Sequence, residues 1–328
     1  MKEVKLGIIG LGTVGTGTLR LLERNASVIA RRAGGPLKTP KIATLNPSKQ
    51  RAVPVDPAIM TGDANEILND PEIAIVAELI GGVKPAKEYV MRAIESGKSV
   101  VTANKELIAK CGVDIQRAAD KAGVDFLFEG GVGGGIPLIK PLRESLAGNN
   151  MSELIGIVNG TTNYILTSMA REGRTFGEVL AEAQRLGFAE TDPSADVDAF
   201  DAVYKLAILA DVAFGVRVRV DDIYREGIRG VSARDIDYAT ELGYVIKLVA
   251  VARHCDDGAL ELRVHPALLP ISHPLASVSD SFNAVMATGD AVGEVMFYGR
   301  GAGSDPTGSA VVGDLIEAAR NIRSGQKC

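Results

Sequence analysis

The sequence contains no tryptophan and few aromatic residues of any kind, at 5% of its 328 residues. Its three cysteines, Cys111, Cys255 and Cys328, are an odd number, lie far apart and form no CxxC pair. This usage predicts neither a disulfide framework nor a zinc site. The three histidines also lack HExxH or any similar ligand spacing.

Long apolar runs and an excess of positive charge are missing as well. No apolar run approaches the roughly 20 residues that cross a bilayer, and the N-terminus leads into a strand pattern instead of a signal peptide. We therefore expect no membrane association and a cytoplasmic location. The net charge is −5, and no basic run is interleaved with aromatic residues. This balance argues against a nucleic-acid partner.

The length and composition are those of an ordinary globular protein. At 328 residues the chain predicts two domains of about 150 residues each. Hydrophobic residues make up 46% of the chain and charged residues 23%, which gives ample material for a buried core. No internal repeat or low-complexity linker interrupts it.

A glycine-rich turn near the N-terminus is the first motif with chemical meaning. It follows an expected strand at residues 4–9, precedes an expected helix at residues 16–30, and consists of Gly10, Leu11, Gly12, Thr13, Val14 and Gly15. In a dinucleotide-binding GxGxxG motif the first glycine makes the tight turn, the second admits the pyrophosphate and the third lets the helix pack on the strand. A glycine turn without a ligand is the alternative.

The next 120 residues alternate strand and helix patterns. Strands are expected at residues 40–45, 73–80, 98–102 and 124–128, with a helix at residues 84–96. This order predicts an α/β fold, a Rossmann-like doubly wound parallel sheet. Because ligands bind at the carboxyl ends of such strands, Thr102 and Lys105 are expected at the cofactor crevice. A lysine in this position is otherwise an ordinary solvated loop residue.

The end of the second strand bears on cofactor preference. An NAD-selective fold carries an acidic residue there for the ribose 2′-hydroxyl, but this chain has Thr44, Leu45 and Asn46, with Lys49 and Arg51 just beyond. These residues permit a 2′-phosphate without requiring one. The sequence leaves NADP or NAD open, with a slight preference for NADP.

Two further glycine-rich segments allow more than one interpretation. Residues 129–137 contain Glu129 and five glycines before Pro137, which begins an expected helix. The segment can bring a carboxylate and carbonyls around a hard cation, but as a sequence pattern it favours a hinge between domains. Residues 299–303 precede a helix opened by Pro306. They suit either an anion at a helix N-terminus or a plain loop.

From residue 151 the pattern changes to longer, mixed elements that predict a second, α+β domain. Strands are expected at residues 154–158, a polar turn at 159–163, and helices at 164–171 and 176–186. Residues 244–253, 260–264 and 291–298 can supply further strands or short helices, whose pairing the sequence leaves open.

The stretch at residues 186–211 carries most of the expected chemistry. It begins as a loop through Gly187 and Pro193, and a single helix is then expected, with Asp196, Asp198 and Asp201 in its first turns. Asp201 and Lys205 stand four residues apart on one face, ahead of an apolar run at residues 206–210. A surface ion pair is the simpler interpretation, but the apolar run favours a buried lysine able to polarise a carbonyl or exchange a proton with it.

Together these segments resemble the homoserine dehydrogenase family over nearly the whole chain. The matching runs are residues 10–15, 78–82, 102–105, 129–137, 159–166, 187–193, 196–210, 264–266 and 297–303. The resemblance implies reversible oxidation of L-homoserine to L-aspartate 4-semialdehyde with NAD(P), on the path to threonine, isoleucine and methionine. It also implies a homodimer, with residues 1–135 and about 300–328 binding the dinucleotide and residues 136–299 binding substrate and the second subunit.

The resemblance assigns roles to individual residues. Lys205 matches a proton donor to the substrate oxygen, and Lys105 matches a lysine between nicotinamide and substrate. Glu190 and Asp201 match substrate-binding carboxylates, the first suited to an ammonium group and the second to a hydroxyl or to orienting Lys205. The backbone of Gly187 and Gly303 matches cofactor contacts, and the sodium ligands of the family match Glu129, Val132, Gly134 and Ile136.

Some features depart from the family pattern, and two other functions stay open. Leu45 replaces an arginine of many NADP-using relatives, and Ala199 replaces a common glycine, which predicts a small packing change. The chain ends soon after its last expected helix, so we expect a short form without a C-terminal regulatory domain. Another semialdehyde dehydrogenase would need a nucleophilic cysteine, for which Cys111 and Cys255 lack an electropositive setting. A non-catalytic nucleotide-binding regulator is the other alternative.

Overall fold

A computed structural model describes residues 3–49 and 51–325 of the chain. It divides the chain into two compact units. Met1–Gly135 and Ala302–Cys328 form the first unit, and Ile136–Gly301 form the second. Cys328 lies outside the described residues, and Cys111 and Cys255 are free thiols. Within the described part of the chain, no helix is long and apolar enough to cross a membrane.

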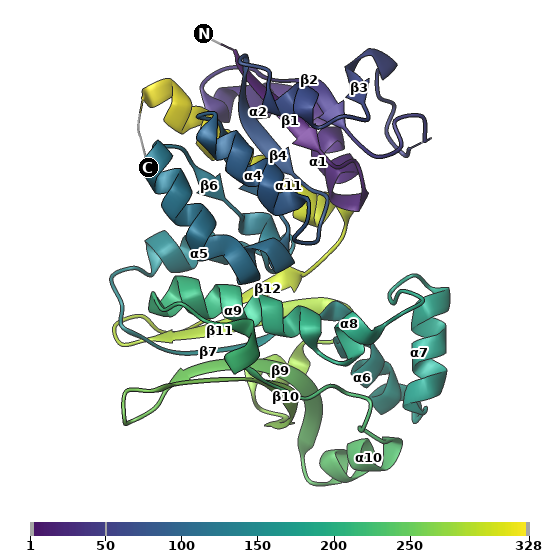
Figure 1. Cartoon of the computed structure of the whole chain (residues 1–328). Coiled ribbons are helices and arrows are strands. Elements are labelled where there is room, and N and C mark those ends of the chain that lie inside the picture. Colours follow the sequence, from purple (N-terminus) through teal and green to yellow (C-terminus); the bar gives the residue numbers. More distant parts are fainter. Residues whose placement is uncertain (1–2, 50, 326–328) are drawn as a thin grey trace. The chain divides into compact units, whose positions relative to one another are not determined.

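The first unit is built on a six-stranded parallel sheet (Figure 1). The strand order is β3-β2-β1-β4-β5-β6. The strands are β1 (Val4–Ile9), β2 (Leu37–Ala43), β3 (Met60–Thr61), β4 (Ile73–Glu78), β5 (Ser99–Thr102) and β6 (Phe126–Leu127). The helices are α1 (Thr13–Arg24), α2 (Ala26–Ala33), η1 (Pro57–Ile59), α3 (Asn65–Leu68), α4 (Ala86–Glu95), α5 (Lys105–Ala122), η2 (Glu129–Gly131) and α11 (Ser304–Ser324). This order is that of the doubly wound dinucleotide-binding fold and confirms the predicted class.

The central strands of this sheet are buried on both faces. Leu6 and Ile8 of β1 and Ile75 of β4 are completely inaccessible to solvent. Apolar residues therefore follow one another along these strands instead of alternating with polar ones, as expected where helices cover both faces of a parallel sheet. Their carboxyl ends converge on one edge, where the glycine-rich turn begins.

The last helix of the chain joins this unit through close contact with α1. A Cβ atom on Gly17 would lie 2.0 Å from the Ser304 carbonyl oxygen, and one on Gly308 would lie 2.7 Å from the Gly17 carbonyl carbon. Only glycine permits such an approach of two helix backbones. The Ser304 hydroxyl also donates to the Thr13 carbonyl at 2.8 Å. The N-termini of α1 and α11 therefore lie side by side.

The second unit contains a mixed six-stranded sheet of order β12-β11-β7-β9-β10-β8. Its pairs are antiparallel except for β8 and β10, which run parallel. The strands are β7 (Met151–Ile157), β8 (Tyr224–Arg225), β9 (Tyr244–His254), β10 (Leu260–Pro270), β11 (Phe282–Gly289) and β12 (Gly293–Arg300). The helices are η3 (Pro141–Ser145), α6 (Gly160–Glu172), α7 (Phe176–Arg185), α8 (Ser194–Val197), α9 (Phe200–Phe214), η4 (Val220–Asp222), α10 (Ala233–Glu241) and η5 (Pro274–Ser277). Helices α6 and α9 pack on the central strands (Figure 1).

Several predicted boundaries were wrong. The helix expected at residues 16–30 starts at Thr13 and is divided at Asn25 into α1 and α2. The strand expected at 40–45 runs from Leu37 to Ala43. The polar turn expected at 159–163 is the N-cap and first turn of α6. Pro137 does not begin a helix, since helical structure starts two residues later, just before η3.

Candidate functional site

The three motif glycines of the first unit each show a distinct geometry. Gly10 has a φ of 105°, and a Cβ there would lie 2.6 Å from the Leu79 carbonyl oxygen. A Cβ on Gly15 would lie 2.1 Å from the Gly10 carbonyl oxygen, whereas one on Gly12 would meet nothing within 4 Å. Gly10 therefore makes the tight turn, Gly15 allows the close packing and Gly12 faces open space at the N-terminus of α1. This is the arrangement that a pyrophosphate requires.

A buried carboxylate organises the neighbouring strand ends. Glu78 is fully buried at the end of β4, where one carboxylate oxygen accepts from the Thr102 hydroxyl at 2.7 Å and the other from the Ile80 amide at 2.9 Å. Burial raises the pKa of Glu78, and these hydrogen bonds oppose the rise. Thr102 in turn accepts from the Asn104 amide at 3.0 Å. Sequence reasoning had given Glu78 no role beyond its place in a matching run.

Thr102 and Lys105 lie at this same edge, as predicted. Asn104 is the N-cap of α5, and its side-chain oxygen accepts from the Leu107 amide at 3.2 Å. Its side-chain nitrogen donates to the Gly82 carbonyl at 2.6 Å. Half-buried Lys105 is the first residue of the helix that Asn104 caps. The cap therefore fixes the backbone from which the lysine side chain extends.

The second unit holds the ion pair that the sequence spacing predicted. Lys205 and Asp201 of α9 are buried, with 8% and 5% of their surfaces exposed, and the Lys205 ammonium donates to the Asp201 carboxylate at 2.7 Å. The ammonium also donates to the Val158 carbonyl at 2.7 Å. The simpler reading, a surface ion pair, was therefore wrong. A buried pair is a costly arrangement that needs such additional hydrogen bonds.

Asn159 is a member of this cluster that sequence reasoning missed. Its side-chain nitrogen donates to Asp196 at 2.7 Å and to Asp201 at 2.8 Å. Its side-chain oxygen accepts from the Thr162 amide at 2.9 Å and caps α6. The available signal was the preference of asparagine for the N-cap position, which predicts a helix start at Asn159 instead of a polar turn.

The helix expected from Asp196 onward is broken at Ala199. Ala199 is fully buried, has a φ of 64° and separates α8 from α9. An L-residue in this left-handed conformation costs about 1 to 2 kcal/mol relative to its preferred one. Alanine in place of the common glycine therefore bears on the backbone conformation at this position. Arg229 holds the break in place through bonds of 2.6 and 3.0 Å to the two carboxylate oxygens of Asp198.

The remaining predicted site residues are distributed over both units. Glu190 and Gly187 are exposed on the loop after α7, and Gly303 is exposed at the N-terminus of α11 with a φ of 124°. In the predicted cation segment, Glu129 begins η2, Val132 and Ile136 are buried, and Gly134 has a φ of 55°. Among residues 3–49 and 51–325, no three or more His, Cys, Asp or Glu side chains are grouped to hold a metal ion.

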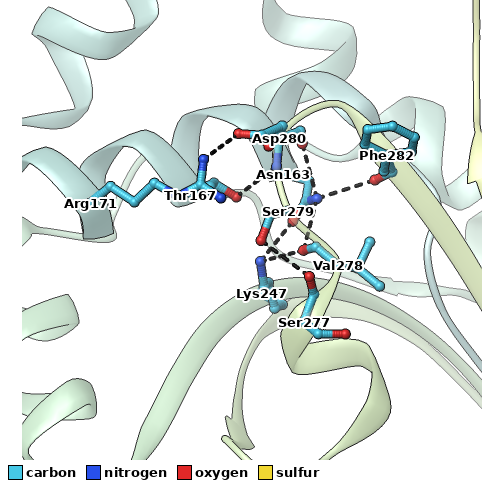
Figure 2. Close-up of polar contacts among 9 residues, drawn as sticks. All are labelled: Asn163, Thr167, Arg171, Lys247, Ser277, Val278, Ser279, Asp280 and Phe282. Atoms are coloured by element: carbon cyan, nitrogen blue, oxygen red, sulfur yellow. Dashed lines mark hydrogen bonds and ion pairs between the residues drawn. The ribbon is translucent and has the colours of Figure 1, made fainter.

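A second buried lysine, Lys247 of β9, lies beneath the first turn of α6 (Figure 2). Lys247 is 4% exposed, and its ammonium donates to the Val278 carbonyl at 2.7 Å and to the side-chain oxygen of Asn163 at 3.1 Å. The Asn163 amide nitrogen contacts the carbonyls of Val278, Asp280 and Phe282 at 3.0 to 3.2 Å. The network therefore fastens the turn at residues 278–282 to α6.

Burial dominates the electrostatics of Lys247. The pKa of Lys247 is lowered from 10.5 to about 8, first by loss of hydration and then by the charge of Arg171, while Asp280 opposes the shift. The two acceptors of the ammonium are neutral oxygens, so neither supplies the compensation that a carboxylate gives to Lys205. The positive charge of buried Lys247 therefore destabilises the folded protein.

Models of known protein families match almost the whole chain. The family model for homoserine dehydrogenase matches residues 137–316. A second model, for the NAD binding domain of homoserine dehydrogenase, matches residues 10–129. Together the two matches include the glycine turn of the first unit and the Asp201–Lys205 pair of the second.

Named relatives and solved structures agree with these matches. The homoserine dehydrogenase of Synechocystis sp. is 51% identical over 327 residues, which are 99% of this chain and 75% of the relative. That of Pseudomonas aeruginosa is 50% identical over 324 residues, 99% of this chain and 74% of the relative. The crystal structure of a homoserine dehydrogenase from Thiobacillus denitrificans has a TM-score of 0.94 at 47% identity and covers 98% of this chain and 74% of its own. A hyperthermophilic archaeal homoserine dehydrogenase in complex with NADPH has a TM-score of 0.81 at 29% identity, over 97% and 98% of the two chains.

Proposed function

The chain belongs to the homoserine dehydrogenase family, and we propose that Lys205 exchanges a proton with the substrate oxygen in the reaction of that family. The protein is an NAD(P)-dependent oxidoreductase that interconverts L-homoserine and L-aspartate 4-semialdehyde in the biosynthesis of threonine, methionine and isoleucine. This assignment supersedes the two alternatives, another semialdehyde dehydrogenase and a non-catalytic regulator.

One observation carries the role of Lys205: its ammonium is buried and held by two protein oxygens. Asp201 and the Val158 carbonyl each accept one of its three N–H bonds at 2.7 Å, and we propose that the third is directed at the substrate oxygen. When bound, the nicotinamide ring supplies the hydride chemistry. In the reductive direction Lys205 donates a proton to the forming alkoxide, and its preorganised positive charge stabilises that oxygen. In the oxidative direction the neutral amine of Lys205 accepts the hydroxyl proton and becomes the ammonium.

The other substrate roles follow from position and charge. Asp201 orients Lys205 and is also proposed to bind the substrate hydroxyl. Glu190 is an exposed carboxylate on the loop after α7, and it is proposed to bind the ammonium group of homoserine. Lys105, at the cofactor edge of the first unit, is proposed to lie between the nicotinamide and the substrate.

The dinucleotide is proposed to bind at the glycine turn and the neighbouring strand and helix ends. The fit rests on open space above Gly12 and on the adjacent N-termini of α1 and α11. The contacting residues are proposed to be Gly10, Gly12, Thr13, Val14, Gly15, Thr102, Lys105, Gly187 and Gly303. A sodium ion is proposed at Glu129, Val132, Gly134 and Ile136, where positive φ angles of 72° and 55° at Gly133 and Gly134 turn the peptide carbonyls.

We also propose that the protein forms a homodimer and is located in the cytoplasm. The second unit presents exposed apolar side chains on two strands of its sheet, Leu268 on β10 and Met296 and Tyr298 on β12. Exposed apolar side chains on a sheet are typical of a surface that another subunit covers. We therefore assign the subunit contact to the second unit.

NADP is proposed as the preferred cofactor because of Arg51. Its guanidinium donates to the Thr44 hydroxyl at 3.2 Å, the Asn46 carbonyl at 2.7 Å and the Leu11 carbonyl at 3.4 Å. It therefore links the end of β2 to the glycine turn, where this fold places the adenosine ribose. The guanidinium also donates to the carbonyls of Pro47 at 3.3 Å and Lys49 at 2.6 Å, so all its acceptors are neutral and its full charge is left to attract a 2′-phosphate. Leu45, where many NADP-using relatives have arginine, is fully exposed.

The wild type is expected to oxidise L-homoserine with a higher kcat/KM for NADP than for NAD. Arg51→Gln is expected to lower kcat/KM for NADP about 10- to 100-fold, the value of a charge-assisted bond to phosphate, and to change the value for NAD little. Initial rates with both cofactors, followed by absorbance of the reduced ring, measure this. Arg32→Gln, which removes an exposed arginine of α2, is the control. If kcat/KM falls equally with both cofactors, Arg51 only maintains the loop structure and does not bind the 2′-phosphate.

A further inference from the structure

The side chain of Asn159 makes hydrogen bonds with every polar atom it has. This residue is 4% exposed and joins the end of β7 to the start of α6. Its nitrogen donates to the Asp196 and Asp201 carboxylates at 2.7 and 2.8 Å, while its oxygen accepts from the Thr162 amide at 2.9 Å. Carboxylates accept and backbone amides donate, so only one orientation of the side-chain amide satisfies all three partners. The amide is therefore fixed.

This fixed amide is directly connected to the proposed proton donor. The Asp201 oxygen that accepts from Asn159 also accepts from the Lys205 ammonium at 2.7 Å. The second acceptor of that ammonium is the carbonyl of Val158, the residue immediately before Asn159. Both oxygens that orient Lys205 are thus set by one two-residue segment between β7 and α6.

The arrangement also brings two carboxylates to one amide group. Asp196 lies on α8 and Asp201 on α9, and the break at Ala199 lies between them. Two carboxylates that approach each other repel, and each needs donors to remain in place. The two N–H bonds of Asn159 supply one donor to each. Without them, we expect Asp201 to adopt other rotamers and the ammonium of Lys205 to follow it.

We propose that Asn159 is a positioning residue for proton transfer, because its amide holds Asp196 and Asp201 so that the Lys205 ammonium is directed at the substrate oxygen. This inference rests on the proposed role of Lys205 and adds a second role to Asn159, which also caps α6. A misplacement of about 1 Å at a reacting group can cost about 100-fold in rate. The effect of losing the amide donors therefore falls mainly on kcat.

Two substitutions separate positioning from capping. Asn159→Ser keeps an oxygen suited to the N-cap, but its short side chain cannot reach both carboxylates. Asn159→Asp also keeps the cap, and it replaces both donors with a third carboxylate. We expect kcat for homoserine oxidation to fall about 10- to 100-fold in both variants, with little change in KM for NADP. Lys205 must lose its proton before it can accept one in the oxidative direction, so the acidic limb of the pH–rate profile is expected to move to higher pH in Asn159→Asp, because added negative charge retains the proton on a nearby ammonium.

A control in the same unit measures the effect of losing a cap alone. Ser232 caps α10, where its hydroxyl accepts from the Asp235 amide at 3.2 Å. Ser232→Ala should lower the melting temperature by a few degrees and leave kcat unchanged. If Asn159→Ser and Asn159→Asp fold, and their kcat and pH–rate profiles stay within twofold of the wild type, the positioning role is overturned. Asn159→Asp decides the matter if Asn159→Ser does not fold.

Lys205→Ala, assayed beside these variants, tests the role of Lys205 in proton transfer separately from the positioning role of Asn159. If Lys205→Ala is inactive and the Asn159 variants are fully active, only the positioning inference fails. If Lys205→Ala itself has normal turnover, the proposed role of Lys205 fails, and the inference about Asn159 fails with it.

Discussion

Lys205→Ala is expected to lower kcat for homoserine oxidation by about 1,000-fold. The substitution removes both the group that exchanges the proton and the buried positive charge that stabilises the alkoxide, and general acid–base catalysis alone contributes about 100- to 10,000-fold. Affinity for the cofactor is expected to change little, because the glycine turn and Arg51 lie in the other unit of the chain. Steady-state kinetics and a fluorescence titration with NADPH measure the two quantities.

Stability must be controlled in this experiment because Asp201 would lose its cationic partner. Leaving one charge of a buried pair uncompensated costs about 3 to 5 kcal/mol, so Lys205→Ala is also expected to melt at a lower temperature. The double variant Asp201→Asn with Lys205→Met removes both charges and should recover most of that stability without recovering activity. If folded Lys205→Ala keeps a turnover within tenfold of the wild type, Lys205 does not take part in the proton transfer.

The second large effect concerns Lys247, which is expected to make the fold more stable as the pH rises from about 8 to about 10. Burial lowers the pKa of Lys247 from 10.5 to about 8 in the folded protein. Between these values the unfolded chain binds more protons than the folded one, so the free energy of unfolding increases with pH. Below pH 8 the buried charge costs roughly 3 kcal/mol, and this cost disappears above the unfolded pKa.

Lys247→Met isolates this contribution. Urea unfolding at several pH values measures the free energy of unfolding of both proteins. The value for the wild type minus the value for the variant is expected to rise by roughly 3 kcal/mol from pH 7 to pH 10.5. The lost hydrogen bonds to Asn163 and Val278 shift this difference by a constant and leave its slope unaffected. Lys121→Met, which removes an exposed lysine of α5, is the control. Parallel curves for wild type and Lys247→Met would show that burial does not perturb Lys247.

The first unit could be predicted well because its signals are local. Gly10, Gly12 and Gly15 lie within six residues, and each has the backbone geometry that the motif assigns to it. The alternation of short apolar runs with helical patterns also predicts the doubly wound parallel sheet. The break at Asn25 was missed because α1 and α2 have compatible helical patterns on either side of it.

The central ion pair was predicted, whereas the chain conformation around it was not. The spacing of Asp201 and Lys205 and the apolar run that follows are enough to predict a buried pair on one helix face. The left-handed conformation of Ala199 has no such signal, because alanine favours a continuous helix. That conformation depends on tertiary contacts such as the bond between Arg229 and Asp198.

Contacts between distant segments account for the other omissions. Asn159 meets Asp201 42 positions away, and Lys247 meets Asn163 84 positions away. The second sheet pairs β7 with both β9 and β11, so its register depends on strands that are far apart in sequence. Residue spacing along the chain does not determine pairings of this kind.

The most direct test of the account is a crystal structure with L-homoserine and NADP bound. The measurement is the distance from the Lys205 ammonium nitrogen to the substrate hydroxyl oxygen. The account predicts a hydrogen bond of about 3 Å, with Asp201 and the Val158 carbonyl still bonded to the same nitrogen. A homoserine hydroxyl bonded to a different side chain, with Lys205 out of hydrogen-bonding reach, would contradict it.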